Sequence, residues 1–221
     1  MLNKLVKTKD LFDPQTPYLK DLFERYEYPW EMLPEIKNYI KELIAGGLEG
    51  FTEIAQGVFV GKDVKIASTV TIEAPAIIGD GCELRPGAYI RGNVIIGRNC
   101  VIGNSTEIKN SVILDKAQIP HYNYVGDSVL GNHAHMGAGS ICSNLKADGK
   151  AVVIKGDEIY ETGLRKIGGI LGDNADIGCG CVLNPGTIIG KRTSVYPLNS
   201  LRGVFPADSI VKSIDNVVER R

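Results

Sequence analysis

The hydrophobic positions of this chain repeat every six residues over most of its length. From Val60 to Leu114 an aliphatic side chain stands at each sixth position, and the spacing resumes from Leu171 to Leu201. Glycine often follows the aliphatic residue, and a small or branched residue often lies four positions after it. A period of six fits neither the 3.6-residue turn of a helix nor the two-residue alternation of a plain strand. It fits a short strand followed by a corner, repeated along the chain.

Three such hexapeptides, each a strand and a corner, close one triangular coil. Successive coils then pair in parallel, with neighbouring strands about 4.8 Å apart. The aliphatic side chains point into the prism, and glycine, of which the chain has 26, suits the tight corners. The pattern therefore predicts a mainly β protein, a parallel β-helix of hexapeptide repeats over residues 51–206.

The segments outside the repeat predict smaller elements. Residues 1–50 carry two apolar stripes at helical spacing, which predict a small N-terminal helical segment that caps the first coil and its unpaired edge. Residues 146–168 interrupt the period and predict an extruded hairpin that turns at Gly156-Asp157. Residues 207–221 predict a C-terminal helix with Asp208 as its N-cap.

Composition excludes several classes of function. The net charge is −1, so there is no global basic field of the kind that nucleic-acid partners require. No apolar run approaches the roughly 20 residues that span a bilayer, and the N-terminus does not read as a secretory signal, so we expect no membrane partner. None of the five cysteines forms a C-x-x-C pair, and Cys82, Cys100 and Cys181 stand at repeat positions. We expect these three to fill the core in a reducing, cytoplasmic compartment.

One stretch of the chain is more specific than the repeat. Residues 121–127, His-Tyr-Asn-Tyr-Val-Gly-Asp, and residues 136–144, Met-Gly-Ala-Gly-Ser-Ile-Cys-Ser-Asn, resemble the C-terminal acetyltransferase domain of the bacterial bifunctional enzyme that makes UDP-N-acetylglucosamine. The resemblance covers roughly residues 60–205 and extends to stand-alone proteins described as UDP-N-acetylglucosamine pyrophosphorylase-related. It implies a left-handed parallel β-helix, a homotrimer, and acetyl-CoA bound between subunits. The handedness rests on this resemblance, because left-handed crossovers are rare in general.

The resemblance implies that His121 is the general base. In that role it takes a proton from the amino group of a glucosamine 1-phosphate-like acceptor as the nitrogen attacks the thioester. An imidazole, with an ordinary pKa of about 6.5, suits the task near neutral pH. His121 also follows Ile119-Pro120, where the period slips by one residue, and a break in a strict repeat often marks function. The alternative is a structural histidine that a neighbouring group satisfies.

The resemblance also implies where the acceptor and coenzyme A bind. Lys109 lies two hexapeptides before the histidine, as in the family, and Arg91 lies three hexapeptides before Lys109, one coil away on the same face. Arg85 matches the local motif more closely but falls on another face. The remaining acceptor contacts map to Tyr124, His135, Asn144 and Lys150, with His135 in place of a family asparagine, and the coenzyme A contacts map to Ala138 and Cys179.

Several of these residues have a second interpretation. Arg91 and Lys109 bind a phosphate or form a solvated charged face. Tyr124 contacts substrate or packs at a corner, and the lysines at 146, 150, 155 and 166 line a phosphate or belong to a solvated loop. In the trimeric carbonic anhydrases, a different β-helix family, three histidines hold zinc and two of them lie five residues apart. The closer pair here, His133 and His135, lies two apart, so we expect no metal.

The sequence therefore predicts an acyltransferase: an acetyl-CoA-dependent N-acetyltransferase acting on an amino sugar phosphate or sugar nucleotide of the UDP-N-acetylglucosamine pathway. No nucleotidyltransferase domain, with its Gly-rich loop, is expected in this chain. With no activated nucleophile evident, the amine would attack the thioester directly. The alternative is a non-catalytic trimer that binds a sugar nucleotide or associates with a separate sugar-phosphate nucleotidyltransferase. Turnover of a thioester separates the two hypotheses.

Overall fold

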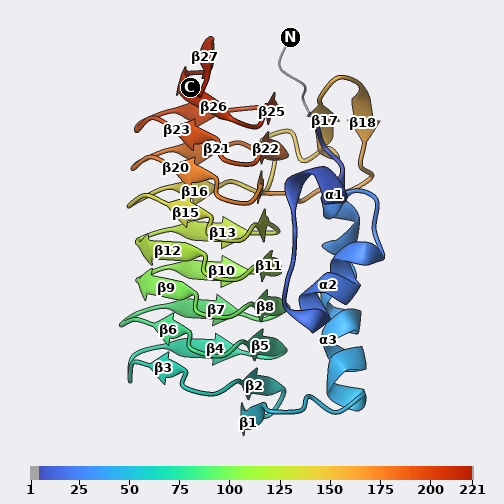
Figure 1. Ribbon diagram of the computed structural model, residues 1–221, viewed down its shortest axis with the longest axis vertical. Coiled ribbons are helices and arrows are strands. Elements are labelled where there is room, and N and C mark those ends of the chain that lie inside the picture. The colour runs from blue at the N-terminus through green and yellow to red at the C-terminus, as the bar shows by residue number, and fades with distance from the viewer. Residues whose placement is uncertain (1–4, 221) are drawn as a thin grey trace.

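The computed structural model describes residues 5–220, and its main body is a parallel β-helix whose coils stack along one axis (Figure 1). Three sheets form the walls, and the chain visits them in the order A, B, C. The corners between them are here called the A–B, B–C and C–A corners. The mainly β, left-handed parallel β-helix that the sequence predicts is confirmed as the fold class.

Sheets B and C each consist of strands from successive coils. Sheet B runs in the order β27 (Asn216–Glu219), β26 (Ser209–Ser213), β23 (Ser194–Val195), β20 (Asp176–Ile177), β15 (His135–Met136), β12 (Gln118–His121), β9 (Val101–Asn104), β6 (Glu83–Leu84) and β3 (Lys65–Ile66). Sheet C runs in the order β24 (Ser200–Leu201), β21 (Val182–Leu183), β16 (Ile141–Cys142), β13 (Tyr124–Gly126), β10 (Glu107–Lys109), β7 (Tyr89–Arg91) and β4 (Thr71–Glu73).

Sheet A forms the third wall. It runs in the order β1 (Thr52–Ala55), β2 (Val58–Val60), β5 (Ala76–Ile78), β8 (Val94–Ile96), β11 (Ser111–Ile113), β14 (Val129–Leu130), β19 (Gly169–Leu171), β22 (Thr187–Ile189) and β25 (Val204–Phe205).

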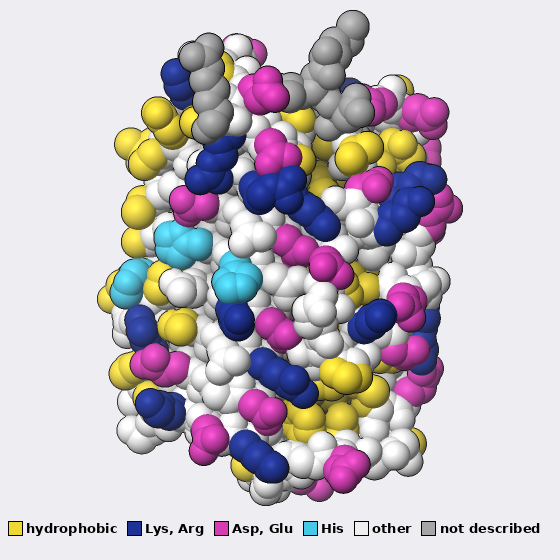
Figure 2. Space-filling model, viewed as in Figure 1, with side chains coloured by type: hydrophobic (Ala, Val, Ile, Leu, Met, Phe, Trp, Pro, Cys, Tyr) yellow, Lys and Arg dark blue, Asp and Glu magenta, His cyan; other side chains and the backbone are white. Residues whose placement is uncertain are grey.

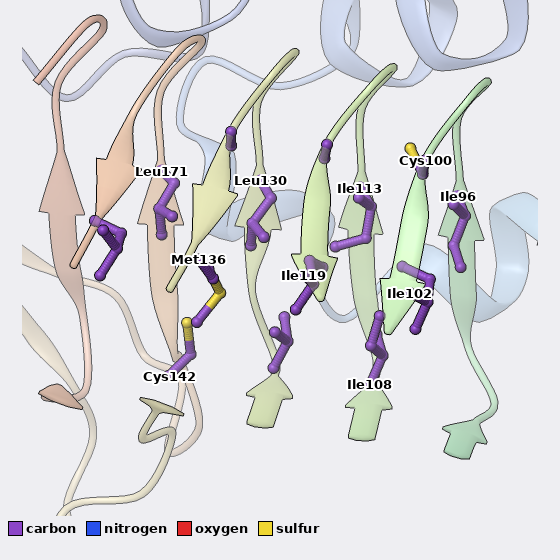
Figure 3. Packing of buried hydrophobic residues seen from close by; sticks show 14 of the residues in the cluster. Ile96, Cys100, Ile102, Ile108, Ile113, Ile119, Leu130, Met136, Cys142 and Leu171 are labelled. Atoms are coloured by element: carbon purple, nitrogen blue, oxygen red, sulfur yellow. The ribbon is translucent and has the colours of Figure 1, made fainter. Parts of the chain in front are cut away.

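The inside of the prism is a stack of mainly aliphatic side chains contributed by the strands of all three sheets. Figure 3 shows Ile96, Ile102 and Ile108 from one coil beside Ile113 and Ile119 from the next. Each is fully buried, and burial of such a side chain stabilises the fold by about 1.5–3 kcal/mol. The predicted core cysteines Cys82, Cys100 and Cys181 are buried, and Cys142 is buried with them. Burial raises the pKa of the Cys142 thiol to about 12.

The register of the repeat changes once before the motif that carries the resemblance. Ile78 pairs with Ile96, three full hexapeptides further on, but Ile96 pairs with Ile113, which is one residue short of that spacing. The prediction that Leu114 points inward is therefore wrong: Ile113 fills the prism, and Leu114 packs outside it. The corner before β11 is shorter by one residue, and Asn110 turns it with a φ of 45°. The predicted slip at Ile119-Pro120 is therefore wrong: the register changes at Asn110, and Ile113, Ile119 and Val125 follow at a regular spacing of six.

The N-terminal helices lie along the prism rather than across its end (Figure 1). They are α1 (Thr8–Leu11), α2 (Pro17–Glu24), the 3-10 helix η1 (Pro29–Met32) and α3 (Ile36–Ala45). Their buried side chains, among them Leu22, Trp30 and Ile40, pack on the outer face of sheet A. That face is itself apolar, with Ile77, Ile95, Val112, Val129, Ile170, Ile188 and Val204 fully or nearly buried. The expected position of these helices, as a cap on the first coil, is therefore wrong, because their apolar surface matches a side wall.

Both ends of the prism close with an antiparallel strand. At the first coil β1 pairs antiparallel with β2, and at the last coil β27 pairs antiparallel with β26. The predicted C-terminal helix is therefore wrong. Residues 209–219 are rich in β-branched side chains, which favour a strand, and Val211 takes a place in the core. Asp208 is not an N-cap; its carboxylate accepts two hydrogen bonds from Arg192.

The predicted hairpin within residues 146–168 is present. Its strands β17 (Val153–Lys155) and β18 (Ile159–Glu161) pair antiparallel, and Tyr160 packs against Tyr28 and Trp30 of the helical segment. After the hairpin the chain rejoins the prism, where Leu171 pairs with Leu130 of the preceding coil. Within residues 5–220, no helix has the length and apolarity needed to cross a membrane.

Candidate active site

The B–C corner brings together three of the residues that the resemblance selects. The N–H of Gly139 donates a hydrogen bond of 3.0 Å to the carbonyl of His121, and the N–H of Gly180 donates one of 2.8 Å to the carbonyl of Ala138. The N–H of Leu198 continues the series to the carbonyl of Cys179 at 2.9 Å. His121, Ala138 and Cys179 therefore stand on successive coils at the same corner. We call this series the corner ladder.

The corner ladder is open to solvent. His121, Ala138 and Cys179 are all exposed. Gly139 and Gly180 take φ values of 71° and 67°, which glycine adopts without strain. No atom lies within 4 Å of the position that a Cβ on Gly139 would occupy. A ligand can therefore approach the backbone closely at Gly139, whereas at Gly180 the side chain of Leu198 lies 2.8 Å from the position of a Cβ. Figure 2 shows the histidine side chains gathered at mid-height on the left of the molecule.

The local sequence positions His121 through a buried asparagine. The side-chain oxygen of Asn123 accepts a hydrogen bond of 3.0 Å from the N–H of His121, while its amide donates one of 2.8 Å to the carbonyl of Gly137. The corner turns at Tyr122, whose φ is 51°. Among residues 5–220, no side chain forms a hydrogen bond or ion pair with the imidazole of His121.

A second group of polar side chains gathers at the C–A corner, around the buried carboxylate of Asp127. That carboxylate accepts hydrogen bonds from the amides of Asn110 (2.9 Å) and Asn144, and Lys109 lies 3.5 Å from it. The hydroxyl of Tyr124 accepts a hydrogen bond of 3.3 Å from Asn144. Burial, with a smaller contribution from the charge of Asp127, raises the pKa of Tyr124. We call this group the Asp127 cluster; it unites the predicted Lys109, Tyr124 and Asn144.

Arg91 lies one coil before Lys109. Ile90 pairs with Ile108, so the residues that follow them are aligned, as the spacing predicts. Arg91 donates a hydrogen bond of 2.7 Å to Glu107, which raises the pKa of the guanidinium. Arg85 follows a strand of sheet B instead, where it pairs with Glu83. The preference for Arg91 as the residue on the face of Lys109 therefore agrees with the register.

Two predicted acceptor residues stand apart from the Asp127 cluster. His135 lies on the outer face of sheet B, where its Nδ1 is 2.8 Å from a carboxylate oxygen of Asp176. Lys150 is exposed in the loop before the hairpin, and no described carboxylate lies within ion-pair distance of its ammonium group. In the described residues, no group of three or more histidine, cysteine, aspartate or glutamate side chains could hold a metal ion.

Sequence reasoning missed two carboxylates. Asp127 lies within the motif quoted for the resemblance, and Glu107 lies just before Lys109 on the same strand, yet neither was singled out. Their hydrogen-bond partners belong to neighbouring coils, far away in the sequence. Adjacent coils align here at a spacing of 17 residues, one short of three hexapeptides, so counting in steps of six does not place Asn110 beside Asp127.

A family model described as "GMPPB C-terminal domain" matches residues 72–163. A bifunctional sugar-1-phosphate nucleotidylyltransferase/acetyltransferase of Sulfurisphaera tokodaii is 35% identical over 175 residues, which cover 76% of this chain and 43% of that protein. The bifunctional protein GlmU of Methanococcus vannielii is 33% identical over an alignment that covers 100% of this chain and 53% of that protein. The chain thus spans about half the length of these relatives.

Among solved structures, the UDP-N-acetylglucosamine acyltransferase of Francisella novicida is similar with a TM-score of 0.48 and 17% identity. The alignment covers 71% of this chain and 58% of that one.

Proposed function

Because this chain is a homologue of the GlmU-type bifunctional nucleotidyltransferase/acetyltransferases and resembles their acetyltransferase domain, we propose that it is an acetyl-CoA-dependent N-acetyltransferase. Its acceptor is an amino sugar phosphate or a sugar nucleotide of the UDP-N-acetylglucosamine pathway. The observation that carries the proposal is the corner ladder, in which an exposed imidazole, without a partner among residues 5–220, shares a corner with small exposed residues on the next two coils.

In the proposed reaction, the amine of the acceptor attacks the carbonyl carbon of the acetyl thioester. His121 takes a proton from the attacking nitrogen as the C–N bond forms. The C–S bond then breaks, and the departing thiolate receives the proton from the imidazolium. Backbone N–H groups at the corner are suited to stabilise the oxyanion that develops between the two steps. Ala138 and Cys179 leave the backbone accessible to coenzyme A.

The two groups of site residues lie at opposite edges of sheet C in one chain. His121 stands at the B–C corner, while Lys109, Tyr124 and Asn144 stand at the C–A corner. We therefore keep the predicted homotrimer as part of the proposal, with acetyl-CoA between neighbouring subunits. Exposed apolar side chains at the B–C corner support this assembly, since Tyr122 is 67% and Leu198 is 84% exposed. All five cysteines are free, which fits the predicted reducing, cytoplasmic compartment.

One observation favours a second function, a non-catalytic trimer that binds a sugar nucleotide or associates with a nucleotidyltransferase. Lys109 already faces the buried Asp127, and Arg91 is already hydrogen-bonded to Glu107. These two cations are therefore partly neutralised before any phosphate arrives. In this second function, sugar nucleotides would bind without consumption of a thioester.

We predict that His121→Ala lowers the rate of acetyl transfer by about 10²–10⁴-fold, the usual effect of removing a general base. The measurement is release of free coenzyme A thiol from acetyl-CoA, across a panel of amino sugar 1-phosphates and UDP-amino sugars. His133→Asn is the matched control. His133 is also an exposed histidine, and its φ of 55° is one that asparagine tolerates.

Both variants must keep the melting temperature and the mass by light scattering of the unsubstituted protein. If folded His121→Ala retains full activity, His121 is not the base. If the unsubstituted protein binds a sugar nucleotide but consumes no thioester with any acceptor, the second function replaces the first.

A further inference from the structure

A cavity of about 200 Å³ lies between the extruded hairpin and the C–A corner of the later coils. The corner contributes Lys146, Arg202 and backbone at Pro185 and Gly186, and the hairpin contributes Lys155 and adjacent valines. The cavity therefore continues the corner that carries the Asp127 cluster, since Lys146 follows closely after Asn144 in the sequence. It belongs to the segment that interrupts the repeat.

The charge lining this cavity has one sign. Three cationic side chains face it, and no aspartate or glutamate is among the residues that line it. Lys146 lies 3.5 Å from Asp148, but for Lys155 and Arg202 no described carboxylate lies within ion-pair distance. Like charges held together in this way repel one another, and an anion placed between them relieves that repulsion. The cavity is thus complementary to a compact anion.

The hairpin is seated firmly enough to preform the cavity. Gly186 has a φ of 76°, and a Cβ on it would lie 2.6 Å from a methyl carbon of Val152. The hairpin can therefore pack this closely on the corner only because residue 186 is glycine. Val152 is fully buried, its N–H donates to the carbonyl of Leu164 at 2.7 Å, and its own carbonyl accepts from Thr162 at 2.6 Å. A preformed cavity loses little free energy to ordering when a ligand binds.

The size of the cavity limits the ligand. Pockets that enclose whole small molecules are usually about 300–1,000 Å³, so a cavity of about 200 Å³ suits a phosphate or diphosphate group rather than an entire nucleotide. Arginine and lysine are the usual partners of phosphate oxygens.

We propose that this cavity binds the diphosphate of a nucleoside diphosphate sugar, held by Lys155 from the hairpin and by Lys146 and Arg202 from the corner. The diphosphate site itself stands on the charge and shape of the cavity. The sugar-nucleotide identity of the ligand rests on the proposed function. If the proposed function holds, a diphosphate site means that the acceptor is a sugar nucleotide and not a sugar 1-phosphate.

The site is tested by calorimetric titration of the full chain with inorganic pyrophosphate. Lys155→Gln and Arg202→Gln should each weaken binding by about tenfold or more, since each removes a hydrogen bond to a charged group. The double variant should show no measurable binding. Lys212→Gln is the matched control, because it removes one charge from the exposed face of β26, outside the cavity, and should leave the affinity unchanged. Equal affinity of the double variant and the unsubstituted protein would overturn the site.

Competition identifies the source of the diphosphate. UDP-N-acetylglucosamine should displace pyrophosphate from the unsubstituted protein, and glucosamine 1-phosphate should do so at least tenfold less well. If inorganic phosphate or pyrophosphate binds but the sugar nucleotide does not compete, the assignment to a sugar nucleotide is overturned. None of these titrations uses acetyl-CoA. Intact pyrophosphate binding without any acetyl transfer would therefore contradict the proposed function and leave the diphosphate site standing.

Discussion

The three outer faces of the prism differ although its interior is uniform. Outward-facing side chains of sheet A, such as Ile95 and Val112, are fully buried beneath the helices. On sheets B and C, the corresponding positions carry polar or half-exposed residues, such as Val101 and Glu107. The hexapeptide repeat sets the inward side chain and leaves the outward one free. The outward residues therefore decide which face contributes to stability and which to chemistry.

The largest difference in unfolding free energy between the faces is expected when matched valines on sheets A and B are replaced by alanine. Val112→Ala removes two buried methyl groups from sheet A and leaves a cavity beneath the helices, at a loss of about 2–3 kcal/mol of the free energy of unfolding. Val101→Ala makes the same change on the half-exposed face of sheet B, where we expect less than about 1 kcal/mol. Urea denaturation measures both. If the two variants lose equal unfolding free energy, packing of the helices on sheet A does not add to the stability of that face.

A smaller effect is expected at Asp127, where a charge is buried at the border between the covered face and sheet C. Asp127→Asn keeps the side-chain shape and suits its φ of 48°, but it turns an amide towards the groups that now donate to the carboxylate. We expect a loss of about 1–3 kcal/mol from the unmatched donors. The exposed Asp157 at the hairpin tip is the control, and Asp157→Asn should change stability by less than about 0.5 kcal/mol. A loss at position 127 no greater than that of the control would show that the Asp127 cluster does not stabilise the fold.

The smallest effect is expected on the open side of the last coil. Asp208 pairs with Arg192, which lowers the pKa of the carboxyl group, and about half of each side chain is exposed. Solvent screening limits the contribution of the pair to about 0.5 kcal/mol. A lowered folded-state pKa stabilises the protein at pH values above the ordinary pKa of aspartate, and this contribution is lost as the pH falls through the lowered value. Asp208→Asn should therefore melt at a slightly lower temperature than the unsubstituted protein at pH 7, and the difference should vanish as the pH falls through the lowered pKa of Asp208. A difference that grows in acid would contradict this origin.

The coil interior could be predicted from the sequence because each inward position reports directly on its own side chain. The position of the slip could not, since Ile113 and Leu114 are both aliphatic and adjacent, and only packing decides which one enters the prism. The helices were recognised by their apolar stripes, but a stripe does not say which surface it covers. Asp208, a residue type common at helix N-caps, favoured a helix in the C-terminal segment. The structure forms β26 and β27 there instead, because strand pairing outweighs this local preference.

The candidate site could be predicted in part for the same reason. Register alone places Arg91 beside Lys109, and the motif contains Tyr124 and Asn144, which the Asp127 cluster unites. The counterion Glu107 could not be foreseen in the same way, because it lies two positions before the aligned Lys109 and pairs with Arg91 diagonally. His135 and Lys150 were assigned by matching a motif, and position in a motif does not determine which sheet or loop carries the residue.

The antiparallel strands at the two ends of the prism have a consequence for how copies of this protein meet. A stack of parallel coils that simply stopped would expose a row of unpaired backbone groups at each end, and these rows would be complementary between copies. Such molecules could join end to end into filaments. β1 reverses direction and covers the end of sheet A at the first coil, and β27 does the same for sheet B at the last coil, so neither end offers three parallel edges for end-to-end pairing. Assembly is thereby directed to the side walls, where closed symmetric contacts are possible.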